Sequence, residues 1–256
     1  MSTVTYEVRD RVAEILLDSP PVNALNEGMI DALLQALRRA AQDDDVRAVI
    51  LGSAVPRRFC AGLQLDALHG APPARAYALV DKLYNGLCEA QFHLGKPSIA
   101  AVGGTARGGG MTLAIHCDLI VAAESATFGY PEIDVGLTPA IHYTHLPRIV
   151  GRHRAFDLLF TGRTFGATEA MSLGLVSRVV PDADVMEQAR ALARTLCAKS
   201  PVVMRMGRMA FHRANDADYR RGVAGAVESF GNVAATDDAR EGIAAFVEKR
   251  KPYWQD

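Results

Sequence analysis

Short apolar runs alternate with amphipathic segments along the N-terminal half of the chain. The runs that have the length of buried strands lie at 46–53, 97–104 and 118–123. Residues 27–41 and 74–94 carry apolar side chains at helical spacing, and a further helix begins near residue 110. Residues 3–17 predict two strands joined by a turn at residues 9–11. This order of strands and helices predicts an α/β fold with parallel strands.

The pattern changes after about residue 146, where helical segments follow one another with turn residues between them. The last of them, "DDAREGIAAFVEKRKPYW", is amphipathic and ends in a basic cluster. We therefore divide the chain into an α/β core of residues 1–195 and a helical C-terminal region of residues 196–256.

Composition excludes several classes of protein. The 256 residues are 49% hydrophobic and 22% charged, which suits one large core. A net charge of -1, with both signs interspersed, predicts no nucleic-acid or membrane-surface patch. No apolar run reaches the roughly 18 residues of a membrane span, and the N-terminus lacks the apolar core of a signal peptide. Four scattered cysteines predict free thiols and no metal site, so we expect a cytoplasmic protein.

The stretch "TARGGGMTLA" places Gly108, Gly109 and Gly110 between a predicted strand and a predicted helix. It lacks the lysine of a phosphate-binding P-loop and the glycine spacing of a dinucleotide-binding loop, while a plain turn remains the simplest alternative. Backbone N–H groups at a helix start have no intrahelical acceptor, and glycine lets a carbonyl oxygen approach them. A second loop, "RRFCAGLQLDAL", has Ala61 and Gly62 after a predicted strand and before an apolar helical stretch. Two such loops predict an oxyanion hole with two backbone donors.

Six segments carry motifs that occur together and in this order in one family. They are "PPVNALN" (20–26), "FCAGLQL" (59–65), "GGTARGGGMTLAIHCDLIVA" (103–122), "ATFGYPEIDVGLTP" (126–139), "LFTGRTFGATEAMSLGLVSRVVP" (159–181) and "DDAREGIAAFVEKRKP" (237–252). The chain resembles the crotonase superfamily, also called the enoyl-CoA hydratase/isomerase family, over nearly its whole length. One departure is Gln64, where the family usually has aspartate.

The resemblance implies a crotonase-like spiral of ββα units with a helical C-terminal trimerisation region, assembled as a homotrimer or a dimer of trimers. It implies an acyl-CoA thioester as the bound partner and no separate cofactor, because coenzyme A is part of the substrate. The resemblance assigns the two donors of the oxyanion hole to the N–H groups of Ala61 and Gly109. The residues that the resemblance assigns to substrate or coenzyme A binding are Ala24, Leu25, Ala61, Leu65, Gly109, Pro131, Phe230, Phe246 and Lys249.

The family's hydratases use two glutamates around one water. This chain keeps one as Glu132 and has Thr112 at the position of the other. A threonine hydroxyl is too weak an acid to supply a base at neutral pH, but it can orient a water or a substrate group. A single carboxylate is sufficient to move a proton between the alpha and gamma carbons, which is the isomerisation of a 3-enoyl-CoA to a 2-enoyl-CoA. Water addition also remains open, because hydroxycinnamoyl-CoA hydratase-lyases resemble this pattern. Dienoyl-CoA isomerases carry acids that match Thr112 and Ala140, and both are missing here.

We therefore expect an enoyl-CoA hydratase, a lyase that adds water to a 2-enoyl-CoA with Glu132 as its single acid and base. The alternatives are a 3-enoyl-CoA to 2-enoyl-CoA isomerase and a catalytically impaired acyl-CoA-binding protein. Burial in an apolar acyl pocket is expected to raise the pKa of Glu132. Asp134 is the weaker acidic candidate. The sequence leaves His142, Tyr143 and His145 open between polar groups of the acyl pocket and packing or subunit contacts.

Overall fold

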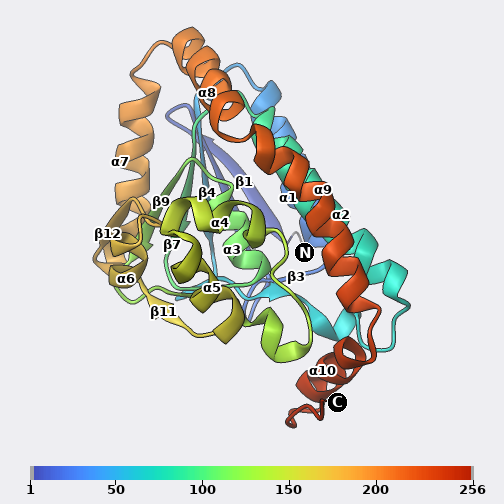
Figure 1. Ribbon diagram of the computed structural model, residues 1–256. Coiled ribbons are helices and arrows are strands. Elements are labelled where there is room, and N and C mark those ends of the chain that lie inside the picture. Colours follow the sequence, from blue (N-terminus) through green and yellow to red (C-terminus); the bar gives the residue numbers. More distant parts are fainter. Residues whose placement is uncertain (1–2, 255–256) are drawn as a thin grey trace.

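Figure 1 shows a twisted sheet with helices packed around it, in a computed structural model that describes residues 3–254. Within these residues the main sheet has six strands in the order β1-β2-β4-β7-β9-β12. They are β1 (Val4–Arg9), β2 (Val12–Leu17), β4 (Ala48–Ser53), β7 (Ser98–Val102), β9 (Leu119–Ala123) and β12 (Arg178–Val180). The pair β1 and β2 is antiparallel, and the remaining neighbours are parallel. The predicted parallel core is confirmed.

Three parallel strands of the main sheet each lead into a short strand of a second sheet. In the described part of the chain this second sheet has the order β11-β10-β8-β5. Its strands are β5 (Arg58–Cys60), β8 (Thr105–Arg107), β10 (Thr127–Gly129) and β11 (Phe165–Gly166). A separate parallel pair joins β3 (Ala24–Leu25) to β6 (Gly62–Leu63). Because β5 and β8 are parallel neighbours, the loops that follow them emerge at the same edge.

Helices follow these strand pairs and cover the sheets. They are α1 (Glu27–Gln42), α2 (Pro73–Phe92), α3 (Gly109–Ile115), α4 (His142–Val150), α5 (Arg152–Thr161), α6 (Ala167–Ser172), α7 (Val185–Cys197), α8 (Pro201–Asn215), α9 (Ala217–Ala234) and α10 (Asp237–Val247). Short 3-10 helices lie at η1 (Leu65–Ala67), η2 (Pro131–Val135) and η3 (Asp182–Asp184).

The helical stretch predicted directly after Gly62 is not found. Gly62 has a φ of +94° and pairs with Ala24, so the chain continues as β6 and then as the three residues of η1. The helix α2 begins only at Pro73, where the missing N–H and fixed φ of proline suit the first helical turn.

The C-terminal helices pack on the core. In Figure 1, α9 runs along α2, and α10 lies at the end of the molecule that carries the C-terminus. The boundary predicted at residues 195 and 196 falls inside α7, which continues to Cys197. Whether residues 196–256 form a trimerisation region stays a prediction.

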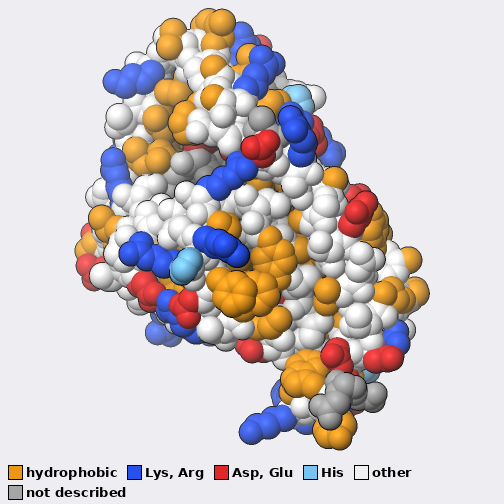
Figure 2. All heavy atoms as spheres, viewed as in Figure 1, with side chains coloured by type: hydrophobic (Ala, Val, Ile, Leu, Met, Phe, Trp, Pro, Cys, Tyr) orange, Lys and Arg blue, Asp and Glu red, His pale blue; other side chains and the backbone are white. Residues whose placement is uncertain are grey.

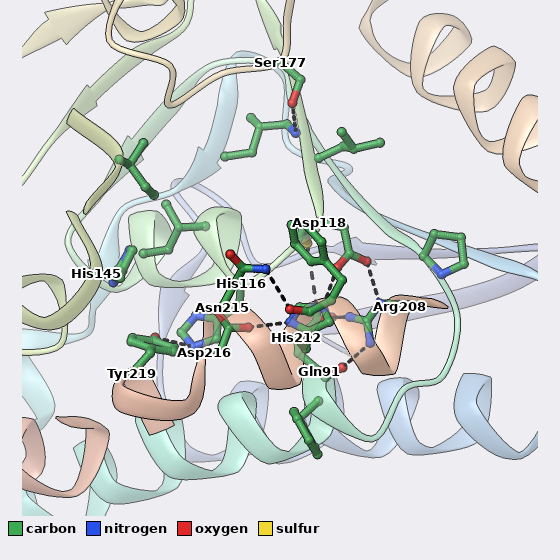
Figure 3. A pocket seen from close by; sticks show the side chains of 18 of the residues that line it. Gln91, His116, Asp118, His145, Ser177, Arg208, His212, Asn215, Asp216 and Tyr219 are labelled. Atoms are coloured by element: carbon green, nitrogen blue, oxygen red, sulfur yellow. Dashed lines mark hydrogen bonds and ion pairs between the residues drawn. The ribbon is translucent and has the colours of Figure 1, made fainter. Parts of the chain in front are cut away.

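A partly buried charge network holds α8 against the sheet (Figure 3). Arg208 donates to Asp118 at 2.8 Å and to the Gln91 carbonyl at 2.8 Å, and His212 lies 2.8 Å from the other Asp118 oxygen. Burial favours protonation of Asp118, but hydrogen bonds from His212 and Arg208 outweigh it, and the pKa of Asp118 is lowered. Hydrogen bonds to Asp118 and Asp216 raise the pKa of His212 to about 9. The network therefore keeps its charges paired across the neutral range.

Hydrophobic side chains gather at two places on the face shown in Figure 2, over α8 and over α5. The helix α8 carries Val203 and Phe211, which are 69% and 66% exposed, and α5 carries the exposed Phe156 and Phe160. No helix in residues 3–254 is long and apolar enough to cross a membrane. The four cysteines are free, as predicted, and all but Cys197 are buried.

Candidate functional site

The two glycine loops meet backbone to backbone. A Cβ placed on Gly62 would lie 2.9 Å from the carbonyl oxygen of Arg107 and 3.2 Å from the nitrogen of Gly109. A Cβ on Gly110 would lie 2.3 Å from the carbonyl oxygen of Cys60. These contacts require residues without side chains. The sequence predicted that the two loops act together, and the structure brings them into contact.

Gly108 shapes the start of α3. Its φ of +50° and ψ of -116° turn the chain from β8 into the helix, and its carbonyl accepts the N–H of Thr112 at 3.1 Å. Gly109 is the first residue of α3, so its N–H has no intrahelical acceptor. This is the amide that the sequence assigned to one half of the oxyanion hole, and that role stays a prediction.

The Ala61 amide differs from the Gly109 amide because it already has an acceptor. Its N–H donates to the carbonyl of Val22 at 3.0 Å, next to the pairing of β3 with β6. An incoming carbonyl oxygen must therefore compete with Val22 for this donor. The sequence assigned Ala61 to the oxyanion hole, and nothing in its pattern indicated this competing bond.

Glu132 lies against the glycine loop. It belongs to η2, and its Oε1 is 3.1 Å from the position that a Cβ on Gly108 would occupy. Its Oε2 is buried and has no hydrogen-bond partner among the described residues. Burial raises the pKa of Glu132 to about 7, as the sequence led us to expect. A carboxyl with this pKa can both take and give a proton near neutral pH.

Asp134, the weaker acidic candidate, is exposed. Its carboxylate lies beside Gly162, where a Cβ would be 2.8 Å from Oδ2. Glu132 lies instead against Gly108, so the two acids contact different glycines.

Thr112 projects from α3 into buried surroundings and contacts a histidine of α4. Its Oγ1 lies 3.2 Å from Nε2 of His142, and both residues are at most 1% exposed. The ring of Tyr130 packs on His142 with centroids 4.5 Å apart. The sequence left His142 open between a polar group of the acyl pocket and a packing or subunit contact. Its burial beside Thr112 favours the first of these, a position next to the candidate site.

The predicted binding residues fall into two groups. Leu25 lies against the loop, with Cδ1 3.0 Å from a Cβ placed on Gly109. Phe230 of α9 is buried and contacts the ring of Tyr84 edge-on at 6.4 Å. Burial raises the pKa of Tyr84, and the charge of Glu132 raises it further.

The other binding residues are less enclosed. Ala24, Leu65 and Pro131 are half-buried beside the same loops. Phe246 is 54% exposed and Lys249 is exposed, near the C-terminal end of α10. Neither of the last two is enclosed in the site of this chain, and their contacts with coenzyme A stay a prediction.

A large cavity lies away from Glu132. It has a volume of about 890 Å³ and is bounded by residues of α2, α8 and α9 together with the ends of the main strands. Figure 3 shows His116, His145 and Tyr219 on one side of it and the Asp118–Arg208–His212 network on another. His116 Nδ1–H donates to the Thr112 carbonyl at 2.7 Å, and its Nε2 accepts from the Tyr219 hydroxyl at 2.8 Å. The described residues contain no group of three or more His, Cys, Asp or Glu side chains that could hold a metal.

A profile of the family described as enoyl-CoA hydratase/isomerase matches residues 7–256. The chain belongs to the enoyl-CoA hydratase/isomerase family. It is 38% identical over 253 residues to a probable enoyl-CoA hydratase of Mycobacterium tuberculosis, with 98% of this chain and 96% of the relative covered. It is 32% identical over 256 residues to a short-chain-enoyl-CoA hydratase of Clostridium acetobutylicum, with coverages of 98% and 97%.

Solved structures of the enoyl-CoA hydratase/isomerase family have the same fold. An enoyl-CoA hydratase/isomerase from Pseudoalteromonas atlantica superposes with a TM-score of 0.87 at 31% identity, covering 99% of this chain and 100% of that one. A carnitinyl-CoA hydratase from Mycobacterium avium gives 0.86 at 32% identity, with coverages of 100% and 99%. The predicted crotonase fold is confirmed, and the chain is an enzyme of this family.

Proposed function

We propose that this enzyme adds water across the double bond of a 2-enoyl-CoA thioester, with Glu132 as its one acid and base. The observation that carries the proposal is the Glu132 carboxyl, which is buried against the glycine loop and has a pKa of about 7. The relatives named enoyl-CoA hydratase at 32–38% identity support the same reaction class.

The proposed reaction needs no second carboxylate. As the water oxygen bonds to the beta carbon, Glu132 takes a proton from that water, and negative charge moves to the thioester oxygen. Protonated Glu132 then gives the proton to the alpha carbon, and the carboxylate is restored. The net change is the addition of one hydrogen and one hydroxyl. A pKa near 7 serves both halves, because the group is neither too weak a base nor too weak an acid.

The thioester oxygen is proposed to accept from the Gly109 N–H at the start of α3 and from the Ala61 N–H. Each backbone donor of an oxyanion hole contributes about 2.7–4 kcal/mol when the charge develops. For Ala61 this stabilisation is smaller, because its N–H already donates to the Val22 carbonyl and must share that hydrogen bond or give it up. Gly109 is therefore expected to be the stronger donor in this enzyme.

The alternative reaction is the isomerisation of a 3-enoyl-CoA to a 2-enoyl-CoA. The observation in its favour is the lone carboxylate, since Thr112 occupies the place of the second acid and contacts His142 instead. Glu132 would then take a proton from the alpha carbon and return it to the gamma carbon of the same chain. Both reactions use the same enolate, so substrate tests must separate them.

The direct test incubates the enzyme with crotonyl-CoA, an aromatic 2-enoyl-CoA and a 3-enoyl-CoA, and follows the absorbance of the conjugated thioester. Hydration predicts a loss of absorbance with a 2-enoyl substrate. A gain with the 3-enoyl substrate, without any loss with the 2-enoyl substrates, would replace hydration by isomerisation. Binding without turnover of any substrate would contradict both.

The pH dependence of kcat/KM is expected to follow Glu132. The carboxylate is the active form of the free enzyme, and its fraction rises as pH increases through about 7. We expect kcat/KM to fall about tenfold per pH unit below pH 6 and to level off above pH 8. The control is the pH dependence of saturated acyl-CoA binding to the Glu132→Gln variant. A flat rate profile between pH 5 and 8 would contradict the assignment.

A further inference from the structure

We infer that His142 is a positioning residue for Thr112, and that the pair takes over the water-orienting part of the missing second carboxylate. The inference rests on the proposed hydration. His142 Nε2–H donates to Thr112 Oγ1 and fixes the direction of the hydroxyl group. Thr112 then holds the attacking water by accepting a hydrogen bond from one of its O–H groups, while Glu132 takes the proton of the other O–H group.

The contact between the two side chains is direct and sealed from solvent. Thr112 Oγ1 and His142 Nε2 are 3.2 Å apart, and the two residues are 1% and 0% exposed. Tyr130 packs on the His142 ring, which restricts its rotation. The carbonyl of Thr112 is held separately by His116 at 2.7 Å, so the first turns of α3 are fixed from two sides.

The tautomer follows from the surroundings of the other ring nitrogen. His142 Nδ1 is buried and has no hydrogen-bond partner among the described residues. An N–H at Nδ1 would be a buried donor without an acceptor, whereas a bare Nδ1 leaves only a weaker unmet acceptor. The proton therefore belongs on Nε2, which faces Thr112.

The ring stays neutral across the working range. Burial lowers the pKa of His142 well below 6.5, and the neighbouring rings of His145 and His116 lower it further, against the smaller effect of the Gly108 carbonyl. The nearby histidines are themselves held neutral by burial, which lowers the pKa of His116 to about 4 and that of His145 to about 3. A neutral donor polarises Thr112 without bringing a charge next to Glu132.

The hydrogen-bond capacity of Thr112 then matches one water. A hydroxyl has one proton and two lone pairs. His142 uses one lone pair. One lone pair remains. Glu132 packs against Gly108, and the Gly108 carbonyl accepts the Thr112 N–H, so both residues lie at the same turn of the loop.

The test is a double-mutant cycle on kcat. Thr112→Val removes the hydroxyl at nearly constant volume, and His142→Phe removes the donor but keeps an aromatic ring. Each single variant is expected to lower kcat for hydration about 10-fold, the size of one neutral hydrogen bond, with little change in KM. Because His142 acts through Thr112, the double variant is expected to be no slower than Thr112→Val. Matched controls, Thr112→Ser and His142→Gln, keep the hydroxyl and a donor and should retain most of kcat.

Two outcomes of the cycle overturn the inference. One is an unchanged kcat in His142→Phe, and the other is a double variant whose loss is the product of the two single losses. A purely structural role for His142 predicts the second outcome. If the wild-type enzyme forms no hydroxyacyl-CoA, the proposed function fails. The NMR measurement described next then still tests the hydrogen bond between His142 and Thr112.

Nitrogen-15 NMR of histidine-labelled wild-type enzyme tests the contact without turnover. The His142 signals are assigned by their absence from the His142→Phe spectrum. We expect a protonated Nε2 and a bare Nδ1 at pH 7, with the Nε2–H signal displaced in Thr112→Val. A protonated Nδ1, an imidazolium, or an Nε2–H signal indifferent to Thr112→Val would overturn the inference.

Discussion

Replacing Glu132 with glutamine is expected to lower kcat for enoyl-CoA turnover by about 10²–10⁴-fold, because the amide can neither take the proton of the water nor return it to the alpha carbon. Binding should persist. Glutamine has nearly the same shape, and the Oε2 position has no hydrogen-bond partner to lose among the described residues. Steady-state rates measure the first effect, and calorimetric titration with a saturated acyl-CoA measures the second.

The matched control for Glu132 is Asp134→Asn, which makes the same chemical change two residues away. Asp134 is exposed and lies beside Gly162, so we expect kcat within twofold of the wild type. Substantial activity in Glu132→Gln together with a loss in Asp134→Asn would transfer the acid/base role to Asp134. Loss of acyl-CoA binding in Glu132→Gln would show that the carboxyl supports the site rather than the proton transfer.

Replacing Gly110 with alanine is expected to destabilise the folded protein by about 3 kcal/mol or more. The added Cβ would lie 2.3 Å from the carbonyl oxygen of Cys60 and 2.9 Å from its carbon. Backbone atoms cannot rotate away as a side chain can. The helix α3 must therefore shift away from β5, which strains the backbone or breaks the contact between the two loops. Urea unfolding at one fixed protein concentration measures the effect.

The control for Gly110 is Gly103→Ala, in the same segment of the chain. A Cβ on Gly103 would meet nothing within 4 Å, and its φ is not in the left-handed region. We expect a change of less than about 1 kcal/mol there. Equal stabilities of the two variants would mean that the two loops are not in the contact described.

The sequence was sufficient for the features that depend on pattern and order. Buried strands, amphipathic helices and the ordered motifs predicted the parallel core, the contact of the two glycine loops and the raised pKa of Glu132. The parallel core follows from local spacing and the joint action of the two loops from their glycines, whereas the pKa of Glu132 was expected from the acyl pocket that the family resemblance implies.

The features that the sequence missed depend on contacts between distant residues. His142 is separated from Thr112 by 30 positions, and only the folded chain brings their two side chains together. The signal available was the bulky, polar "IHYTH" where the family is commonly glycine-rich, and it did not distinguish a site from packing. Likewise, the bond from Ala61 to Val22 arises from the pairing of β3 with β6, two strands too short to predict.

The most direct test of the account is product analysis after the wild-type enzyme has acted on crotonyl-CoA in deuterated water. If Glu132 moves the proton of water, the product will be a 3-hydroxyacyl-CoA with one deuterium at the alpha carbon, and Glu132→Gln will form almost none of it. Mass spectrometry and proton NMR identify both positions. Recovery of unhydrated crotonyl-CoA, or of a shifted double bond with deuterium and no hydroxyl, would contradict the proposed hydration.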